Sequence, residues 1–435
     1  MKPEADPSSA GTFAVDSSSA VTLRAVKLVG GGVALSHADG ITWMVRGALP
    51  GELVRARPDR FRARVVEATT LELVADPHPA RLADGCPHAP ACGGCDWPHV
   101  DNDGGARLKA EVAAEASGPV SILAERLRAA PVTASPGAYR LRCRLHWDPA
   151  VGRLGFFGSR SREVIAIPDC RIITRTLSAR LADVTAALAS RCPAPVDLEW
   201  LEGDDGVVAA LRPAPGNGSL PEAGWMLPRN AIPDLAGCHR LTARGRLLDG
   251  WGLDRVHMAL PISLEVPIGS FFQGNRHLIH WLFLRLAELI GQGDEPVFDL
   301  HGGVGFIAAA ARHGGRIGLT VVEPHPPAAA AARRNLSHAR IVTATAERFV
   351  GGATELPPRS LVVTDPPRTG MTTNLRNALV RWRPKRLIML GCDPATWSRD
   401  AGSLIERGYH LTHLELVDLF PFTHHVEVLA VLEDR

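Results

Sequence analysis

The chain has 435 residues, of which 46% are hydrophobic and 22% charged. These values are typical of a globular protein with roughly two to four domains. The formal net charge is only +2, so any contact with nucleic acid must come from a local basic surface. No apolar run approaches the roughly 20 residues that cross a bilayer, and we expect a cytoplasmic protein without membrane contact. The eight cysteines in such a reducing compartment indicate metal binding or catalysis before disulfides.

The first section is a polar tail followed by short β-prone runs. Residues 1–20 are small and polar, which predicts a disordered tail and excludes a signal peptide. Residues 21–76 alternate β-prone runs with Gly and Pro, which predicts a small antiparallel barrel. Residues 21–70 hold eight Lys and Arg against four Asp and Glu. This excess favours an RNA-binding module, although a merely solvated basic face would look the same.

Three cysteines within ten residues form the most specific metal signature of the chain. They are Cys86, Cys92 and Cys95, and glycines lie between the last two. Such clustered thiolates fit an iron-sulfur cluster or a zinc site, and either needs another ligand. Cys170, which follows a Pro-Asp turn, is the best candidate. In a zinc site His88 and His99 would be alternative ligands.

The other cysteines before residue 300 have no ligand-like spacing. In residues 139–145, strand alternation places Cys143 on an apolar face with Tyr139 and Leu141. The opposite face carries a row of arginines that could meet RNA: Arg140, Arg142 and Arg144. We therefore interpret Cys143 as a core residue, and Cys192 and Cys238 as structural.

From residue 263 onward, strand-like and helix-like segments alternate, which predicts a parallel sheet with helices on both faces. The glycines of residues 299–305 follow the first strand of this section, where they let a ligand approach the backbone. Glu323 ends the second strand, where an acid commonly holds ribose hydroxyls. The pattern predicts a nucleoside cofactor, and on this evidence a nicotinamide dinucleotide fits as well.

Cys392 lies at the end of the apolar run 386–391, which predicts a buried strand. A thiol at a strand's carboxyl end beside a helix start can act as a nucleophile. An isolated cysteine is more often a buried structural residue, so its surroundings must decide.

Five separated motifs, in a constant order, carry a family resemblance. They are the cysteine set with its distant fourth member, the Ser-Phe-Phe-Gln of 270–273, Asp-Pro-Pro-Arg of 365–368, Gly-Cys-Asp-Pro-Ala-Thr of 391–396, and Phe-Pro-Phe-Thr-His-His-Val-Glu of 420–427. From about Val21 to its end the chain resembles the S-adenosylmethionine-dependent RNA uracil-5-methyltransferases. It is most similar to their iron-sulfur branch with a TRAM barrel, which modifies ribosomal RNA.

The resemblance implies a fold and a set of roles. It implies a TRAM-like, OB-like β-barrel that binds RNA over 21–76, an α+β central domain with an iron-sulfur cluster over 77–262, and a Rossmann-like class I methyltransferase domain over 263–435. Cys392 would add to carbon 6 of uracil, and Glu427 would remove the proton from carbon 5. The positions that would contact S-adenosylmethionine or line its pocket are Gln273, His301, Phe306, Glu323 and Asp365, and those that would bind a 4Fe-4S cluster are Cys86, Cys92, Cys95 and Cys170.

Some residues depart from the family pattern, and some alternatives stay open. His301, Gly302 and Phe306 replace the family's usual residues, which affects side-chain contacts with the cofactor. An amino-group methyltransferase would need an aromatic residue where Arg368 stands, and the motif around Glu427 favours uracil over cytosine. The expected substrate is a uridine of 23S ribosomal RNA in a monomeric enzyme. The alternatives are transfer RNA, or a non-catalytic RNA-binding protein on the same scaffold.

Overall fold

The computed structural model describes residues 20–89, 91–118, 122–216, 220, 226–229, 234–352 and 355–434. The chain forms two compact units, Met1–Arg81 and Leu82–Arg435. Apart from Ala20, the expected disordered tail lies outside the described residues. Within the described ranges, no helix is long and apolar enough to cross a membrane.

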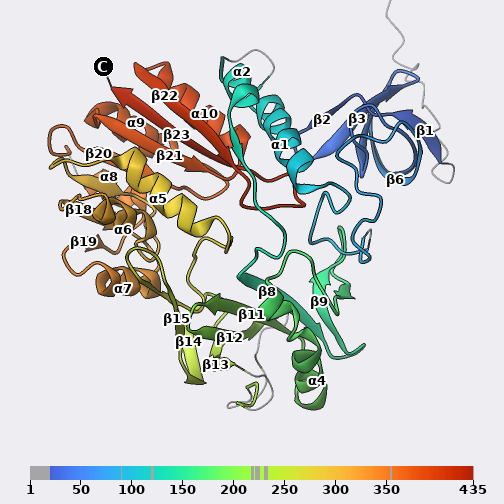
Figure 1. Cartoon of the computed structure of the whole chain (residues 1–435), viewed down its shortest axis with the longest axis horizontal. Helices are drawn as coiled ribbons and strands as arrows, with labels where there is room; N and C mark the ends of the chain where they lie inside the picture. Colours follow the sequence, from blue (N-terminus) through green and yellow to red (C-terminus); the bar gives the residue numbers. More distant parts are fainter. Residues whose placement is uncertain are drawn as a thin grey trace, which may run out of the picture. The chain divides into compact units, whose positions relative to one another are not determined.

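The first unit is a six-stranded sheet, blue in Figure 1. Its strands are β1 (Val21–Arg24), β2 (Lys27–Val29), β3 (Val33–Ala38), β4 (Ile41–Arg46), β5 (Leu53–Arg62) and β6 (Val65–Ala75). They lie in the order β1-β5-β6-β4-β3-β2. Alternate residues of β4 are buried, as expected of a strand with one face in a core. The expected antiparallel arrangement is wrong for β4 and β6, which pair in parallel. Strand β5 lies between them in the chain and runs antiparallel to β6, so the chain reverses its direction twice between β4 and β6.

The second unit contains a seven-stranded central sheet, green in Figure 1. Its strands are β8 (Arg142–Asp148), β9 (Arg153–Phe157), β10 (Val164–Ala166), β11 (Val196–Gly203), β12 (Gly206–Pro213), β13 (Leu235–Leu241) and β14 (Leu247–Gly252). The order is β10-β9-β8-β11-β12-β13-β14. Helices α3 (Arg175–Ser178) and α4 (Leu181–Arg191) pack their apolar side chains against it. A hairpin of β15 (Arg255–Met258) and β16 (Leu264–Pro267) follows.

The burial pattern predicted for residues 139–145 is confirmed, although strand β8 begins only at Arg142. Tyr139, Leu141, Cys143 and Leu145 are all buried. Cys192 and Cys238 are buried as well, as expected of structural residues. Burial raises the pKa of Cys143 and of Cys238 to about 12, so neither thiol is reactive.

The last section forms an eight-stranded sheet, orange and red in Figure 1 apart from its short edge strand β7. Its strands are β7 (Val132–Thr133), β17 (Val297–Asp299), β18 (Leu319–Val322), β19 (Arg340–Val342), β20 (Leu361–Thr364), β21 (Arg386–Gly391), β22 (Tyr409–Val417) and β23 (Glu427–Asp434). The order is β19-β18-β17-β20-β21-β23-β22-β7, and β23 alone runs antiparallel to its neighbours. The predicted strand and helix alternation is confirmed.

Helices cover both faces of this sheet. One face packs against α5 (Ile279–Ile290), α6 (Phe306–His313) and α7 (Pro326–Asn335). The other packs against α1 (Asn102–Ala116), α2 (Ile122–Ala129), α8 (Ala346–Gly352), α9 (Thr373–Trp382) and α10 (Pro394–Ile405). In β21, Ile388 and Leu390 enter the first core, whereas Leu387 and Met389 enter the second. This is why the strand reads as a continuous apolar run.

Three elements that precede residue 263 pack on this last sheet. Helices α1 and α2 belong to one of its cores, and β7 pairs in parallel with β22. The expected domain boundary at residues 262 and 263 stays a prediction.

Candidate active site

The candidate site lies at the carboxyl ends of the parallel strands. The strand order reverses between β17 and β20, and open α/β sheets bind ligands at such a switch point. Asp299 ends β17 and Asp365 follows β20, so both carboxylates lie at this point. Glu323 follows β18, and Cys392 follows β21.

The loop after β17 brings its backbone close to neighbouring side chains. A Cβ at Gly302 would stand 2.2 Å from Val321 Cγ1, so only glycine fits there. Gly303 and Gly305 have positive φ angles of 54° and 93°, which favour glycine. The Gly303 N–H donates to Glu323 Oε2 over 2.9 Å, and the His325 N–H donates to Oε1 over 2.7 Å. Glu323 therefore holds the loop, and its contact with a ribose stays a prediction.

Two acids of the site hold their protons unusually well. Burial, and next the charge of Asp365, raise the pKa of Asp299 to about 7. Burial also raises the pKa of Asp365 to about 6, against a hydrogen bond from Gln273 Nε2 to its Oδ2 over 3.1 Å. A cationic ligand would favour the ionised form of both groups. The site is thus suited to a positively charged cofactor such as a sulfonium.

His301 and Phe306 flank the glycine loop in different ways. His301 Nδ1 lies 2.9 Å from Thr364 Oγ1, and burial lowers the pKa of this histidine to about 4, so the ring is neutral. The Phe306 ring packs edge-on against Phe272 and Phe283, with centroids 5.8 and 5.7 Å apart. The ring therefore belongs to the core, and a contact of Phe306 with the cofactor stays a prediction.

The register of β21 and β23 brings Cys392 and Glu427 together. Gly391 pairs with Val428 in antiparallel register, which places the next residue of one strand opposite the preceding residue of the other. Those residues are Cys392 and Glu427. The thiol is half-buried, whereas the carboxylate is almost fully buried.

Both members of this pair have raised pKa values. Burial, and then the charges of Glu427 and Asp365, raise the pKa of Cys392 to about 11, and Arg368 opposes the shift. Burial and the charge of Asp365 raise the pKa of Glu427 well above its ordinary value. Glu427 Oε1 is buried without a hydrogen-bond partner among the described residues. A buried carboxylate without a partner on one oxygen suits a base that meets a proton of a bound ligand.

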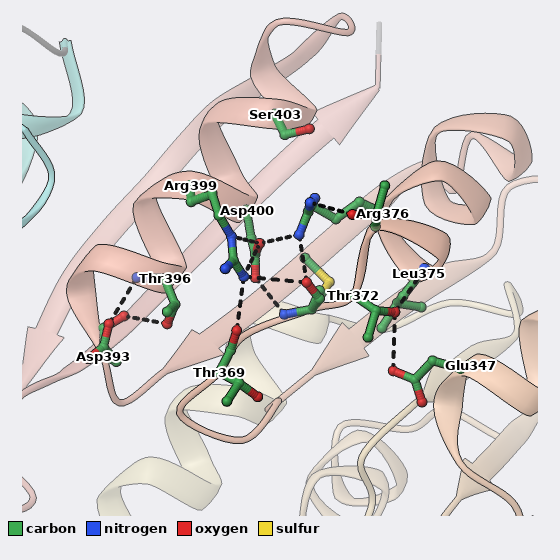
Figure 2. Close-up of polar contacts among 12 residues, drawn as sticks. Glu347, Thr369, Thr372, Leu375, Arg376, Asp393, Thr396, Arg399, Asp400 and Ser403 are labelled. Atoms are coloured by element: carbon green, nitrogen blue, oxygen red, sulfur yellow. Dashed lines mark hydrogen bonds and ion pairs between the residues drawn. The ribbon is translucent and has the colours of Figure 1, made fainter.

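A polar network ties the loop after Asp365 to the helix after Cys392 (Figure 2). Asp400 of α10 accepts from the Met371 N–H over 2.6 Å and pairs with Arg376 over 2.8 Å. The Arg368 carbonyl accepts from Thr396 Oγ1 over 3.0 Å. The network fixes the Asp-Pro-Pro-Arg loop relative to the amino end of α10, and so relative to Cys392.

A cavity of about 270 Å³ lies beside Gln273. Phe271 and Phe420 line it, together with the row Arg140, Arg142 and Arg144. Arg142 and Arg144 pair with the buried Glu199, at 2.6 and 3.3 Å. The three arginines thus line this cavity, and Arg142 and Arg144 share one carboxylate partner. Their contact with RNA stays a prediction.

The four predicted cluster cysteines line one cavity: Cys86, Cys92, Cys95 and Cys170. Burial, and next the charges of the other three thiolates, raise the pKa of Cys95 to about 12. Four mutually close thiols that repel as thiolates are a set that a metal centre would stabilise. His88 lines the same cavity, but its Nε2 lies 2.7 Å from Asp169.

The spacing of these sulfurs bears on the choice of metal. Tetrahedral zinc, with Zn–S near 2.3 Å, brings its sulfurs to roughly 3.8 Å from one another. Among these four described cysteines, no three sulfurs lie within 4.8 Å of one another. A cubane holds its sulfurs farther apart, because each binds a different iron. The choice between zinc and an iron-sulfur cluster stays a prediction.

Several residues of the site were not predicted from the sequence. Asp299, Asp400 and Arg368 act through burial or through contacts that only the tertiary structure forms. Asp96, beside Cys95, meets His424 Nδ1 at 2.7 Å. Their neighbouring motifs were the available signal, since Asp299 opens the glycine motif and His424 precedes Glu427 by three positions.

Comparison with known proteins places the chain among methyltransferases. A family model described as tRNA (Uracil-5-)-methyltransferase matches residues 358–435. The 23S rRNA (uracil(1939)-C(5))-methyltransferase RlmD of Pseudomonas entomophila is 32% identical over 431 residues, covering 94% of this chain and 92% of the relative. RlmD of Alkalilimnicola ehrlichii is 31% identical over 454 residues, covering 92% and 94%.

A solved structure has the same fold. The Pyrococcus abyssi tRNA (uracil-54, C5)-methyltransferase, in complex with S-adenosyl-L-homocysteine, superposes with a TM-score of 0.72 at 20% identity. The match covers 95% of this chain and all of the other. At this identity the likeness concerns the fold.

Proposed function

Because the chain belongs to the family of S-adenosylmethionine-dependent RNA uracil-5-methyltransferases, we propose that it methylates carbon 5 of a uridine in 23S ribosomal RNA through a covalent adduct with Cys392. The observation that carries this proposal is the strand register that sets the Cys392 thiol opposite the buried Glu427 carboxylate. The ribosomal substrate rests on the relatives, which are named for it.

The two residues divide the reaction between them. As a thiolate, Cys392 forms a bond to carbon 6, and the ring electrons move toward the carbonyl to leave carbon 5 nucleophilic. S-adenosylmethionine, when bound, supplies an electrophilic methyl group on a positive sulfonium. Glu427 then takes the proton from carbon 5, the double bond re-forms, and the carbon 6–sulfur bond breaks. The raised pKa of Glu427 makes it a stronger base than an exposed carboxylate.

The cofactor would lie at the switch point. Gln273, Asp365 and Asp299 border it, and a positive sulfonium would lower the pKa values of the two acids. Glu323 would hold the ribose hydroxyls while it fixes the glycine loop, and His301 would contribute a neutral ring. Phe306 would contribute its backbone alone.

The two catalytic roles are separable by mutation. Cys392→Ala should form no covalent RNA complex and transfer no methyl group, because carbon 5 is not activated. Glu427→Gln should still add to the ring and accept the methyl group, and then stall as a covalent protein–RNA adduct. With methyl-labelled cofactor, this adduct should carry label through denaturing electrophoresis. Normal turnover by Glu427→Gln, or 5-methyluridine from Cys392→Ala, would show that the roles are wrong.

Transfer RNA is the second candidate substrate, because the matching family model is described as a tRNA methyltransferase. Mapping 5-methyluridine in the RNA of a strain without this protein separates the two. Loss from 23S ribosomal RNA supports the first proposal, and loss from transfer RNA alone supports the second.

The four cavity cysteines would bind a 4Fe-4S cluster. Four thiols that line one cavity, three of them within ten residues of the chain, support such a cluster. We expect anaerobically purified protein to be brown and to contain about four iron atoms per chain, and Cys95→Ser protein to lose this iron. A colourless protein with one zinc per chain would contradict the proposal. Nothing in uracil methylation requires electron transfer, so the cluster would be structural.

The remaining proposals concern the domains, the cellular location and the oligomeric state. The first unit, with its excess of basic residues, would act as a TRAM-like RNA-binding barrel. The residues from 77 to 262 would form the central domain and those from 263 the methyltransferase domain. A cytoplasmic, monomeric enzyme is the corresponding prediction for the whole protein.

A further inference from the structure

The cavity lined by Cys86, Cys92, Cys95 and Cys170 is here called the cysteine site. The loop that precedes Glu427, here called the base loop (residues 418–426), is held by the segment around Cys95 and by the segment around Cys170. Beyond Cys95, the Trp97 N–H donates to the Phe422 carbonyl over 2.9 Å. Beside Cys170, the Arg171 guanidinium carbon lies 5.3 Å from the centre of the Phe422 ring. Phe422 also packs against the same core as three of the cysteines. The base loop is therefore attached to the cysteine site by backbone, aromatic and apolar contacts.

A series of side-chain contacts continues from this attachment to the Asp-Pro-Pro-Arg segment of residues 365–368, here called the catalytic loop. Asp96 Oδ2 meets His424 Nδ1 at 2.7 Å. The rings of His424 and His425 lie with centroids 4.1 Å apart. His425 Nε2 in turn lies 3.1 Å from Arg368 Nη2. Arg368 closes the Asp-Pro-Pro-Arg segment that begins with Asp365.

The donors and acceptors along this chain are consistent. The Arg368 guanidinium can only donate, so His425 Nε2 must accept and its ring must be neutral. Burial, and next the charges of His424 and Arg368, lower the pKa of His425 to about 4, in agreement. The ionised Asp96 can only accept, so His424 Nδ1 donates to it. Arg368 is also the cationic side chain whose charge lowers the pKa of Cys392.

We propose that Asp96 and His424 are positioning residues, which act through His425 to hold the Arg368 guanidinium in the catalytic loop and so tie the rate of methylation to the cysteine site. The proposal rests on the proposed roles of Cys392 and Glu427. It assigns a specific consequence to the segment beside Cys95: this segment does not react, but it holds the Arg368 guanidinium and the base loop that precedes Glu427.

The same residues could be mistaken for a cation site. Donor atoms of Asp96, His424 and His425 lie within 4.8 Å of one another. Arg368, however, donates to Nε2 of His425. Its positive charge would also repel a divalent ion. The neighbouring arginine therefore disfavours a metal ion at this group.

The test compares two aspartates that each neighbour a cysteine of the cysteine site: Asp96 follows Cys95, and Asp169 precedes Cys170. Asp96→Ala removes the link, whereas Asp169→Ala is the matched control. Asp169 pairs with His88 over the same 2.7 Å and precedes Cys170, but it lies outside the chain to Arg368. Asp96→Asn keeps an oxygen that accepts from His424. Each holoprotein is measured for iron per chain, kcat, KM for RNA and KM for S-adenosylmethionine.

We expect Asp96→Ala to lower kcat by about tenfold, with both KM values changed by less than about twofold, since the lost contact acts on the reacting groups and not on binding. Iron content should stay at the wild-type value. Asp96→Asn should recover most of the rate, His424→Ala should behave as Asp96→Ala does, and the double variant should be no slower than either. Asp169→Ala should keep the wild-type kcat.

Several outcomes would overturn the inference. Loss of iron from Asp96→Ala, or an equal loss of kcat in Asp169→Ala, would show a general effect on the cysteine site. An unchanged kcat in Asp96→Ala would show that the contact between Asp96 and His424 does not affect the rate of methylation. A stoichiometric zinc ion that disappears in His424→Ala would show a metal site instead. If the wild-type protein makes no 5-methyluridine, the proposed function fails and not this inference alone.

Discussion

Cys392, the proposed nucleophile, lies in an environment that disfavours its thiolate. Burial and two carboxylates raise its pKa to about 11, and Arg368 alone among the named charges lowers it. At neutral pH the unliganded thiol is therefore almost wholly protonated. A positively charged cofactor near Asp365 would lower this pKa. We therefore expect this thiol to react slowly with alkylating agents in the free enzyme and faster once the cofactor is bound.

The influence of single charges on this thiol is directly measurable. Glu427→Gln removes a negative neighbour, so the pKa of Cys392 should fall and its alkylation by iodoacetamide at pH 8 should accelerate. Arg368→Ala removes the positive neighbour, so the pKa should rise and alkylation should slow. Below the pKa, each unit of change alters the thiolate fraction about tenfold. Peptide mass spectrometry, with Cys392→Ala as the blank, assigns the modified residue. Equal rates in all proteins would show that these charges do not reach the sulfur.

At the scale of elements, the network around Asp400 connects α10 with the loop before α9. Asp400 is buried, and its oxygens meet the Met371 N–H and the Arg376 guanidinium. Thr372 caps α9 by accepting from the Leu375 N–H over 3.3 Å. These contacts hold α10, α9 and the loop before α9 together. They therefore place the segment of Asp365 next to the segment of Cys392.

Removal of this carboxylate should destabilise the protein. Asp400→Ala leaves the Arg376 charge and a backbone N–H without their buried partner, which costs about 3 kcal/mol. Urea unfolding followed by circular dichroism measures the loss. The control is Glu347→Ala, whose carboxylate accepts from the exposed Thr372 hydroxyl over 3.3 Å and whose removal should change stability by less than about 0.5 kcal/mol. Equal stabilities of the two variants would show that the network is not a structural clamp.

At the scale of the whole molecule, the chain forms two units with different charge and chemistry. The first holds the basic six-stranded sheet, and the second holds both the cysteine site and the switch point. Arg81 belongs to the first unit, since it pairs with the buried Glu52 and donates to the Gly47 carbonyl over 2.8 Å. A clean separation therefore falls after Arg81.

Deletion of residues 1–81 tests the division of labour. RNA affinity should fall, and the logarithmic salt dependence of binding should lose about 0.9 in slope for each phosphate contact removed. Affinity for S-adenosylhomocysteine should stay within about twofold, because the switch point lies wholly in the second unit. Titration calorimetry with the nucleoside, and filter binding with RNA at several salt concentrations, give both quantities. An unchanged salt slope would show that the first unit is not an RNA-binding module.

The features that the sequence determined by itself depend on residues that are close to one another in the chain. The alternation of apolar residues in 139–145 predicted which side chains are buried, and the continuous run 386–391 predicted a strand with both faces covered. Both follow from the repeat of the β-strand, which acts between near neighbours. The position of Cys392 after a strand was likewise predicted from its own short segment. The roles of Cys392 and of the cavity cysteines stay predictions.

Tertiary structure alone decided which distant residues meet. Asp96 and His424 are 328 positions apart, yet they form one hydrogen bond. Likewise β7 joins β22, and β4 pairs in parallel with β6. The opposition of Cys392 and Glu427 also depends on the register of β21 and β23. Such pairings follow from the burial of whole surfaces and from strand order, so no local periodicity encodes them.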